Sequence, residues 1–161
     1  MEKIYLKDYK APEFNIEYVD LEFDLAEESV TVTNRMHLKS KGAAALKLDG
    51  EKIELRSISL NGKKLNADQY EVQTGSLRIH QVPKEFDLEI VTHFNPKQNT
   101  ELSGLYFSGG YLCTQCEAEG FRRITYFLDR PDNMALFTTT IVADKTQYPV
   151  LLSNGNLTEH G

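Results

Sequence analysis

The feature that most constrains the fold is an alternation of apolar and polar residues with a period of two, which recurs along most of the chain. It is clearest in two runs whose apolar members are Val19, Leu21, Phe23 and Leu25, then Val30, Val32, Met36 and Leu38. Successive side chains of a strand point to opposite faces, so this period predicts strands with one buried face. Residues 26–29 between the runs suit a hairpin, and we expect the two strands to pair antiparallel.

A change of phase marks the next strand. Ile53 and Leu55 alternate in one phase, whereas Ile58 and Leu60 alternate in the opposite one, which predicts a bulge near Ser57. A bulge adds one residue to a strand and moves all later side chains to the other face.

Turn signals separate these strands from the following ones. Asn61-Gly62 predicts a two-residue hairpin, and Asn95-Pro96 ends an alternating run that begins at Phe86. Between Met134 and Val142 apolar residues and threonines occupy both phases, which predicts a strand buried on both sides. Nowhere does a period of 3.6 residues persist for three helical turns.

The expected fold class is all-β, with two packed or strongly curved sheets rich in antiparallel pairs. A length of 161 residues suits one domain, residues 1–161, and allows roughly two-thirds of the unfolded surface to be buried. A turn signal at Ser153-Asn154-Gly155-Asn156 lies very close to the last residue. Because such turns lead into another strand, we expect a fragment of a longer multidomain protein.

Charge and hydropathy exclude several classes of partner. The net charge of −6, with both signs mixed along the chain, excludes a general nucleic-acid binder, which needs a basic face. No apolar run reaches the length of about 18 residues that spans a bilayer, so no membrane partner is expected. The first residues lack the apolar core of a signal peptide, and we expect a cytoplasmic protein with reduced cysteines.

The segment from Tyr111 to Asp132, YLCTQCEAEGFRRITYFLDRPD, departs from the alternation. Cys113 and Cys116 have the spacing of a redox pair or of half a zinc site. A structural zinc needs four ligands, and the sequence holds no second CxxC pair and no closely spaced pair of histidines. Unpaired structural thiols are the favoured interpretation, with a redox switch and a metal site as the alternatives.

The acids of the same segment allow two interpretations. In an extended backbone Gln115, Glu117 and Glu119 share one face, which makes a wall of acceptors suited to a cation. Alternatively, Arg122 and Arg123 fold back and neutralise the carboxylates. The sequence carries no complete catalytic set, with neither a GxSxG, a phosphate-binding loop nor an H-E-x-x-H motif.

The run CTQCEAEGFRRITYFLDRPD resembles the Q-C-E-A-E-G-F-R … D-R-P-D segment of bacterial aminopeptidase N, a zinc-dependent gluzincin family. The stretches YKAPEFNIEYVDLEFDL, NTELSGLY and FTTTIVADKTQYPVLLSNGN resemble the N-terminal domain of that family in the same order. The resemblance implies a saddle-shaped β-domain that lies against a thermolysin-like catalytic domain. It also implies that the zinc ligands and the catalytic residues lie outside this chain, which should bind no metal and be inactive alone.

The resemblance gives two residues of this chain a role in substrate binding. Gln115 matches the residue that lines the pocket for the first side chain of the substrate, and Glu117 matches the carboxylate that binds its free α-amino group. Glu119 matches the next acid of the motif, to which the resemblance assigns no contact with the amine. The implied partners are peptides with a free N-terminus and the catalytic domain of the same protein. The alternative from another class is a stand-alone β-sandwich binding or scaffold protein without catalytic activity.

Overall fold

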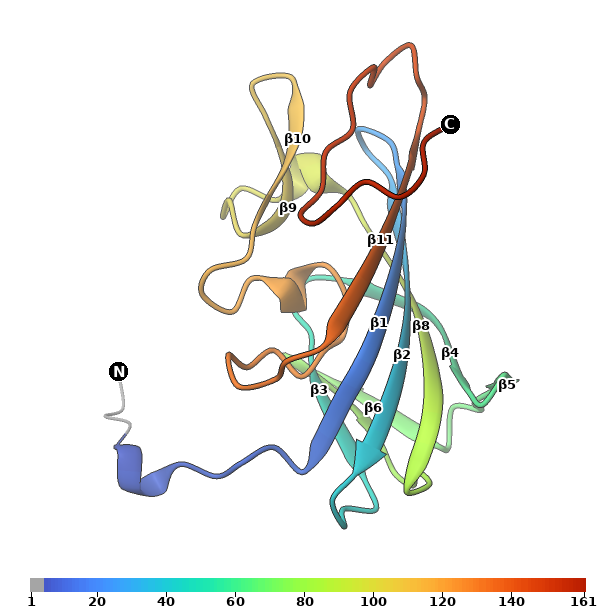
Figure 1. The fold of residues 1–161 in the computed structure, drawn as a ribbon, viewed down its shortest axis with the longest axis vertical. Helices are drawn as coiled ribbons and strands as arrows, with labels where there is room; N and C mark the ends of the chain where they lie inside the picture. The colour runs from blue at the N-terminus through green and yellow to red at the C-terminus, as the bar shows by residue number, and fades with distance from the viewer. Residues whose placement is uncertain (1–4) are drawn as a thin grey trace.

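The computed structural model describes residues 5–161 and shows an all-β fold, as the alternation predicts (Figure 1). Its strands are β1 (Phe14–Leu25), β2 (Val30–Ser40), β3 (Leu46–Asp49), β4 (Glu54–Leu60), β5 (Lys63–Lys64), β6 (Tyr70–Gln73), β7 (Ser76–Ile79), β8 (Glu85–Phe94), β9 (Gly104–Ser108), β10 (Tyr111–Gln115) and β11 (Leu136–Ala143). Within the described residues the helical segments are three short 3-10 turns, η1 (Leu6–Asp8), η2 (Pro96–Gln98) and η3 (Phe121–Arg123). No helix in this part of the chain could cross a bilayer.

A six-stranded sheet in the order β11-β1-β2-β8-β4-β5 forms the body of the molecule. Strands β3, β7 and β6 form a smaller antiparallel sheet, and β9 and β10 form a separate two-stranded ribbon (Figure 1). One face of the large sheet supplies most of the core, and β3 and β7 close it with four buried residues, Leu46, Leu48, Leu77 and Ile79. The buried side chains form one continuous apolar cluster between the two sheets.

The predicted turns and the predicted bulge are present. Strands β1 and β2 pair antiparallel through the predicted hairpin, with Leu25 opposite Val30. The register of β4 against β8 shifts between Leu55 and Ser57, which is the bulge that the phase change predicts. Asn61 and Gly62 join β4 to β5 with φ values of 50° and 75°, as a type I′ turn requires.

Strand β11 is the one whose environment the sequence predicts wrongly. It lies at the edge of the large sheet, where it pairs in parallel with β1, and most of its residues are exposed. Leu136 is 68% exposed and Phe137 is 51% exposed. Apolar residues in both phases therefore mark a surface strand here, because the period alone cannot distinguish a core from an uncovered apolar surface.

Candidate functional site

The ribbon β9–β10 leads into the segment that the sequence singles out (Figure 1). Strand β10 ends at Gln115, and residues 117–120 form a turn before η3. The prediction that Gln115, Glu117 and Glu119 share one face of an extended strand is therefore wrong. The chain leaves the strand because the amide of Gly120 donates to the carbonyl of Cys116, at 2.8 Å, and closes the turn. We call residues 115–120 the acidic turn.

Gly120 permits the tightness of this turn. A Cβ atom at this position would lie 2.6 Å from the carbonyl oxygen of Gln115 and 2.8 Å from the Cα atom of Cys116. Both contacts are with backbone, which cannot move aside as a flexible side chain can. Gly120 is buried, whereas Gln115, Glu117 and Glu119 are exposed. The turn thus rests on its glycine and presents its polar side chains outward.

The two acids of the turn differ in their partners. Glu119 lies 3.5 Å from Nη2 of Arg122, so the neutralising interaction predicted as an alternative exists at this residue. Glu117 forms no ion pair with any residue in the range 5–161. The amide Nε2 of Gln115 donates to the backbone carbonyl of Glu117 at 3.1 Å, which leaves the Glu117 carboxylate unengaged.

The two arginines after the turn are held mainly by other carboxylates. Arg122 donates from Nε to Oδ2 of Asp129 at 2.8 Å, and both side chains are about 15% exposed. Arg123 contacts Glu51, at 3.0 Å, and Glu101. The prediction that both arginines fold back onto the acidic turn is therefore correct only for Arg122 and only at Glu119.

The chain beyond η3 is locked into the core. Ile124, Tyr126 and Phe127 are at most 5% exposed and belong to the core. Phe127 and Asp49 exchange two backbone hydrogen bonds at 2.8 and 3.0 Å, which joins the segment to the end of β3. The hydroxyl of Thr92 on β8 donates to the carbonyl of Ile124 at 2.9 Å.

Cys113, just before the acidic turn, and Cys116, within it, are both free thiols. Burial, with a smaller effect of the Asp129 carboxylate, raises the pKa of the Cys116 thiol above its ordinary value. A raised pKa lowers the fraction of reactive thiolate, which disfavours a redox switch at this residue. Among residues 5–161 no group of three or more His, Cys, Asp or Glu side chains is placed to hold a metal ion.

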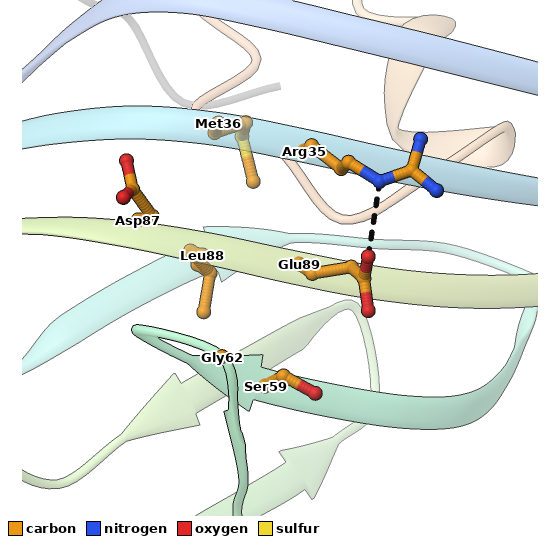
Figure 2. Close-up of a pocket in the computed structure, with 7 residues that line it drawn as sticks. All are labelled: Arg35, Met36, Ser59, Gly62, Asp87, Leu88 and Glu89. Atoms are coloured by element: carbon orange, nitrogen blue, oxygen red, sulfur yellow. Dashed lines mark hydrogen bonds and ion pairs between the residues drawn. The ribbon is translucent and has the colours of Figure 1, made fainter.

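A second polar cluster lies on the outer face of the large sheet and is separate from the acidic turn in sequence. Figure 2 shows a surface depression there, in which Arg35 of β2 donates to Glu89 of β8 at 3.0 Å. The same guanidinium also contacts Glu22 and Asp20, at 3.2 and 3.6 Å. Because its acidic neighbours satisfy this cation, the depression is a salt-bridged sheet surface and offers no free charge for an anionic ligand.

Comparison with known proteins identifies the domain. The family model described as the Peptidase M1 N-terminal domain matches residues 8–161. The chain belongs to this family. Aminopeptidase N of Escherichia coli K12 is 48% identical to this chain over 159 residues, and aminopeptidase N of Haemophilus influenzae is 46% identical over 155 residues. The matches cover 98% and 94% of this chain and 18% of each relative, so this chain spans less than a fifth of their length.

Solved structures support the same assignment. Legionella pneumophila aminopeptidase A, crystallised in complex with aspartic acid, superposes on this chain with a TM-score of 0.90 and 38% identity. The match covers 96% of this chain and 19% of that one. An M1 zinc metallopeptidase of Deinococcus radiodurans has a TM-score of 0.69 at 14% identity, which shows the shared fold alone. The predicted resemblance and the predicted all-β fold class are thereby confirmed.

Proposed function

We propose that this domain is part of a cytoplasmic zinc aminopeptidase of the aminopeptidase N type, and that its acidic turn binds the free N-terminus of the peptide substrate. The observation that carries the proposal is the state of Glu117, which is exposed and has no ion pair within residues 5–161, next to a paired Glu119. The similarity to the aminopeptidases of Escherichia coli and Legionella supports the reaction class.

The chemistry of Glu117 suits this task. A carboxylate accepts charge-assisted hydrogen bonds from an ammonium group, and these are about twice as strong as bonds between neutral groups. Fixing the α-amine of the substrate also fixes which carbonyl reaches the reacting centre, so that one residue is released per turnover. Gln115 ends β10 and donates to the backbone carbonyl of Glu117. In the proposed site its side chain would line the pocket for the first substrate residue.

The remaining parts of the reaction centre belong to the proposed catalytic domain. Residues 5–161 contain no group of three or more His, Cys, Asp or Glu side chains placed to hold a metal ion. We therefore assign the zinc ligands to the longer enzyme and expect the 161-residue chain alone to be inactive. When bound, zinc would polarise the substrate carbonyl and lower the pKa of a water molecule. The exposed apolar side chains of β10 and β11, which include Tyr111, Leu136 and Phe137, suit a surface that a second domain covers.

The substitution Glu117→Gln in the longer enzyme tests the proposal. It keeps the shape of the side chain and removes the charge that would face the ammonium. Because hydrogen bonds to charged groups contribute roughly 1.5–3 kcal/mol, we expect kcat/KM on a free-amine substrate to fall by about ten- to a few-hundredfold. Zinc content and melting temperature should stay at the wild-type values.

Glu119→Gln is the matched control, because it removes the same charge from the same turn at a residue already paired with Arg122. Its effect on kcat/KM should be smaller. Acetylation of the substrate amine should nearly abolish turnover by the wild type and erase the difference from Glu117→Gln. If Glu117→Gln keeps kcat/KM within about twofold of the wild-type value, Glu117 does not bind the amine.

A further inference from the structure

The ion pair between Arg122 and Asp129 lies directly beside the acidic turn but does not belong to it. We infer that Arg122 is a positioning residue for Glu117: it fixes the base of the turn and neutralises Glu119, so that Glu117 alone faces the substrate ammonium. This inference rests on the proposed function of Glu117 and adds a residue that the site depends on without touching the substrate.

The acidic turn is held at both of its ends. Gln115 ends β10, which pairs with β9 in a two-stranded ribbon that shares no ladder with the other sheets. Leu105 of β9 is buried in the core, and Leu112 and Cys116 pack against the core, so the ribbon holds the first end of the turn. The position of Glu117 therefore also depends on an anchor at the other end of the turn, at η3.

Arg122 supplies that anchor through three hydrogen bonds to one residue, Asp129. Its backbone amide and its Nε both donate to Oδ2 of Asp129, at 3.2 and 2.8 Å, and its Nη2 donates to the carbonyl of Asp129 at 3.1 Å. The planar guanidinium makes such multiple contacts in one rigid arrangement, which a lysine ammonium cannot reproduce.

The body of the domain holds both members of the pair. The amide of Asp129 donates to Oδ2 of Asp49 at 3.3 Å, and the amide of Glu51 donates to the carbonyl of Arg122 at 2.9 Å. Asp49 ends β3, so the pair connects the small sheet to the turn. The side chains of Arg122 and Asp129 are 16% and 14% exposed, and this partial burial strengthens the interaction relative to a surface ion pair.

The same guanidinium also selects which acid remains available. Nη2 of Arg122 lies 3.5 Å from Oε2 of Glu119 and reduces the negative charge next to Glu117. Without Arg122, two neighbouring exposed carboxylates would compete for one ammonium, and the substrate amine would have two positions to occupy. Arg122 therefore helps to fix the position of Glu117 and leaves Glu117 as the one carboxylate of the turn without an ion pair.

The contacts that hold residues 124–127 in the core do not involve the side chain of Arg122. Residues 124–127 are held by their burial in the core, by Thr92 and by the backbone pairing of Phe127 with Asp49. A substitution at Arg122 removes none of these contacts. The expected consequence is a displaced turn on an intact domain.

Arg122→Lys in the longer enzyme is the test variant, because it keeps the charge and loses the multiple contacts. The readout is recognition of the ammonium, measured as the ratio of the inhibition constants of propanamide and L-alaninamide, which differ only in the amine. A loss of folded enzyme leaves inhibition constants unchanged, whereas a displaced carboxylate lowers the ratio. We expect the ratio and kcat/KM each to fall by about tenfold, since a misplacement of about 1 Å can cost up to 100-fold.

Asp129→Asn should give a similar fall, because it weakens the other side of the same pair. Arg35→Lys is the matched control: Arg35 also pairs with carboxylates, but on the outer face of the large sheet. Its ratio and kcat/KM should stay within about twofold of wild type. Combining Arg122→Lys with Glu117→Gln should lower the ratio no further than Glu117→Gln alone, because both changes act on one contact.

The outcomes separate the two proposals. If Glu117→Gln lowers the ratio but Arg122→Lys does not, or if the two losses multiply in the double variant, the positioning role is wrong and the amine anchor stands. If Glu117→Gln leaves the ratio unchanged, the amine anchor is wrong and the positioning role falls with it.

Discussion

At the scale of single residues, a few buried polar groups hold the segment that follows the acidic turn. Thr92 is fully buried on β8, and its hydroxyl donates to the carbonyl of Ile124 at 2.9 Å. Asn34 on β2 is equally buried and donates to Thr125 and to the carbonyl of Tyr126, at 3.3 and 3.4 Å. These groups link two central strands of the sheet to a segment without regular structure, so the segment has a defined position.

Thr92→Val should therefore destabilise the domain. The substitution preserves the shape of the side chain but leaves the buried carbonyl of Ile124 without its donor, which costs about 1–3 kcal/mol. The free energy of unfolding from urea titration measures the effect. Thr140→Val on the exposed surface of β11 is the matched control and should change stability by less than about 0.5 kcal/mol. Equal effects of the two substitutions would show that the Thr92 hydrogen bond contributes nothing.

At the scale of the elements, β1, β2 and β8 are joined by charged side chains on their outer face. His37 of β2 lies between carboxylates of both neighbouring strands, with Nδ1 at 2.7 Å from Asp87 and Nε2 at 3.2 Å from Glu85. Glu17 of β1 lies 3.9 Å from Nε2, and Lys39 also contacts Glu17 and Glu85. Carboxylates only accept, so both ring nitrogens can donate only when the imidazole is protonated.

Stability should for this reason depend on pH through His37. The hydrogen bond to Asp87, partly offset by burial, raises the pKa of His37 above its ordinary value of 6.5. A raised pKa means that the stabilisation is fully present below pH 6.5 and is lost as the pH rises through the folded-state pKa. The difference in urea midpoint between the wild type and His37→Gln should be largest near pH 5.5 and should shrink above neutrality.

His80→Gln is the control for this measurement, since His80 is exposed and forms no ion pair within residues 5–161. Its urea midpoint should follow that of the wild type at every pH. A constant difference between wild type and His37→Gln from pH 5.5 to 8.5 would contradict the proposed dependence on protonation.

Most elements, but not the environment of the site, can be predicted from the sequence. The bulge before Ser57 and the turn at Asn61-Gly62 follow from local rules of phase and turn chemistry, and both are present. The exposure of β11 depends on what covers the sheet edge, which no local pattern encodes. The residues at the acidic turn are predictable from the resemblance, but their geometry depends on close packing at Gly120.

The ion pair between Arg122 and Asp129 was not predicted from the sequence, because it also depends on tertiary packing. Both residues stand out in the sequence, yet the nearest acids to Arg122 along the chain are Glu117 and Glu119. The fold selects Asp129 because that residue is fixed by Asp49 at the end of β3, at a distance in sequence that no spacing rule covers. A sequence with many acids and arginines predicts that pairs form, but not which ones.

At the scale of the whole molecule, the domain exposes apolar side chains at one edge. Met134 and Leu136 are 81% and 68% exposed, just before β11 and at its first residue. Phe137 on the same strand packs against Phe121 and Phe127, with ring centroids 6.2 and 6.1 Å apart, so this edge adjoins the segment that carries the acidic turn. Within the proposed longer enzyme, such a surface suits the contact with the catalytic domain.

Leu136→Lys tests this placement. In the 161-residue chain the side chain is exposed, and the substitution should change the free energy of unfolding by less than about 0.5 kcal/mol. In the longer enzyme it should place a charge in a buried contact and lower the melting temperature by several degrees. Val72→Lys, at an exposed valine on β6, should leave both proteins unchanged. An unchanged melting temperature for Leu136→Lys in the longer enzyme would show that β11 stays uncovered.

The parallel pairing of β1 with β11 also sets the order of events during synthesis. Tyr18 lies opposite Leu136, so the first strand made meets its outer neighbour only after more than a hundred further residues have been added. At roughly 5–20 residues per second, this delay is on the order of ten seconds. During that time β1 can pair with β2 through their hairpin, but its other edge remains open to strands of neighbouring chains. A nascent chain of this domain is thus most exposed to misassembly after β2 has left the ribosome and before β11 has.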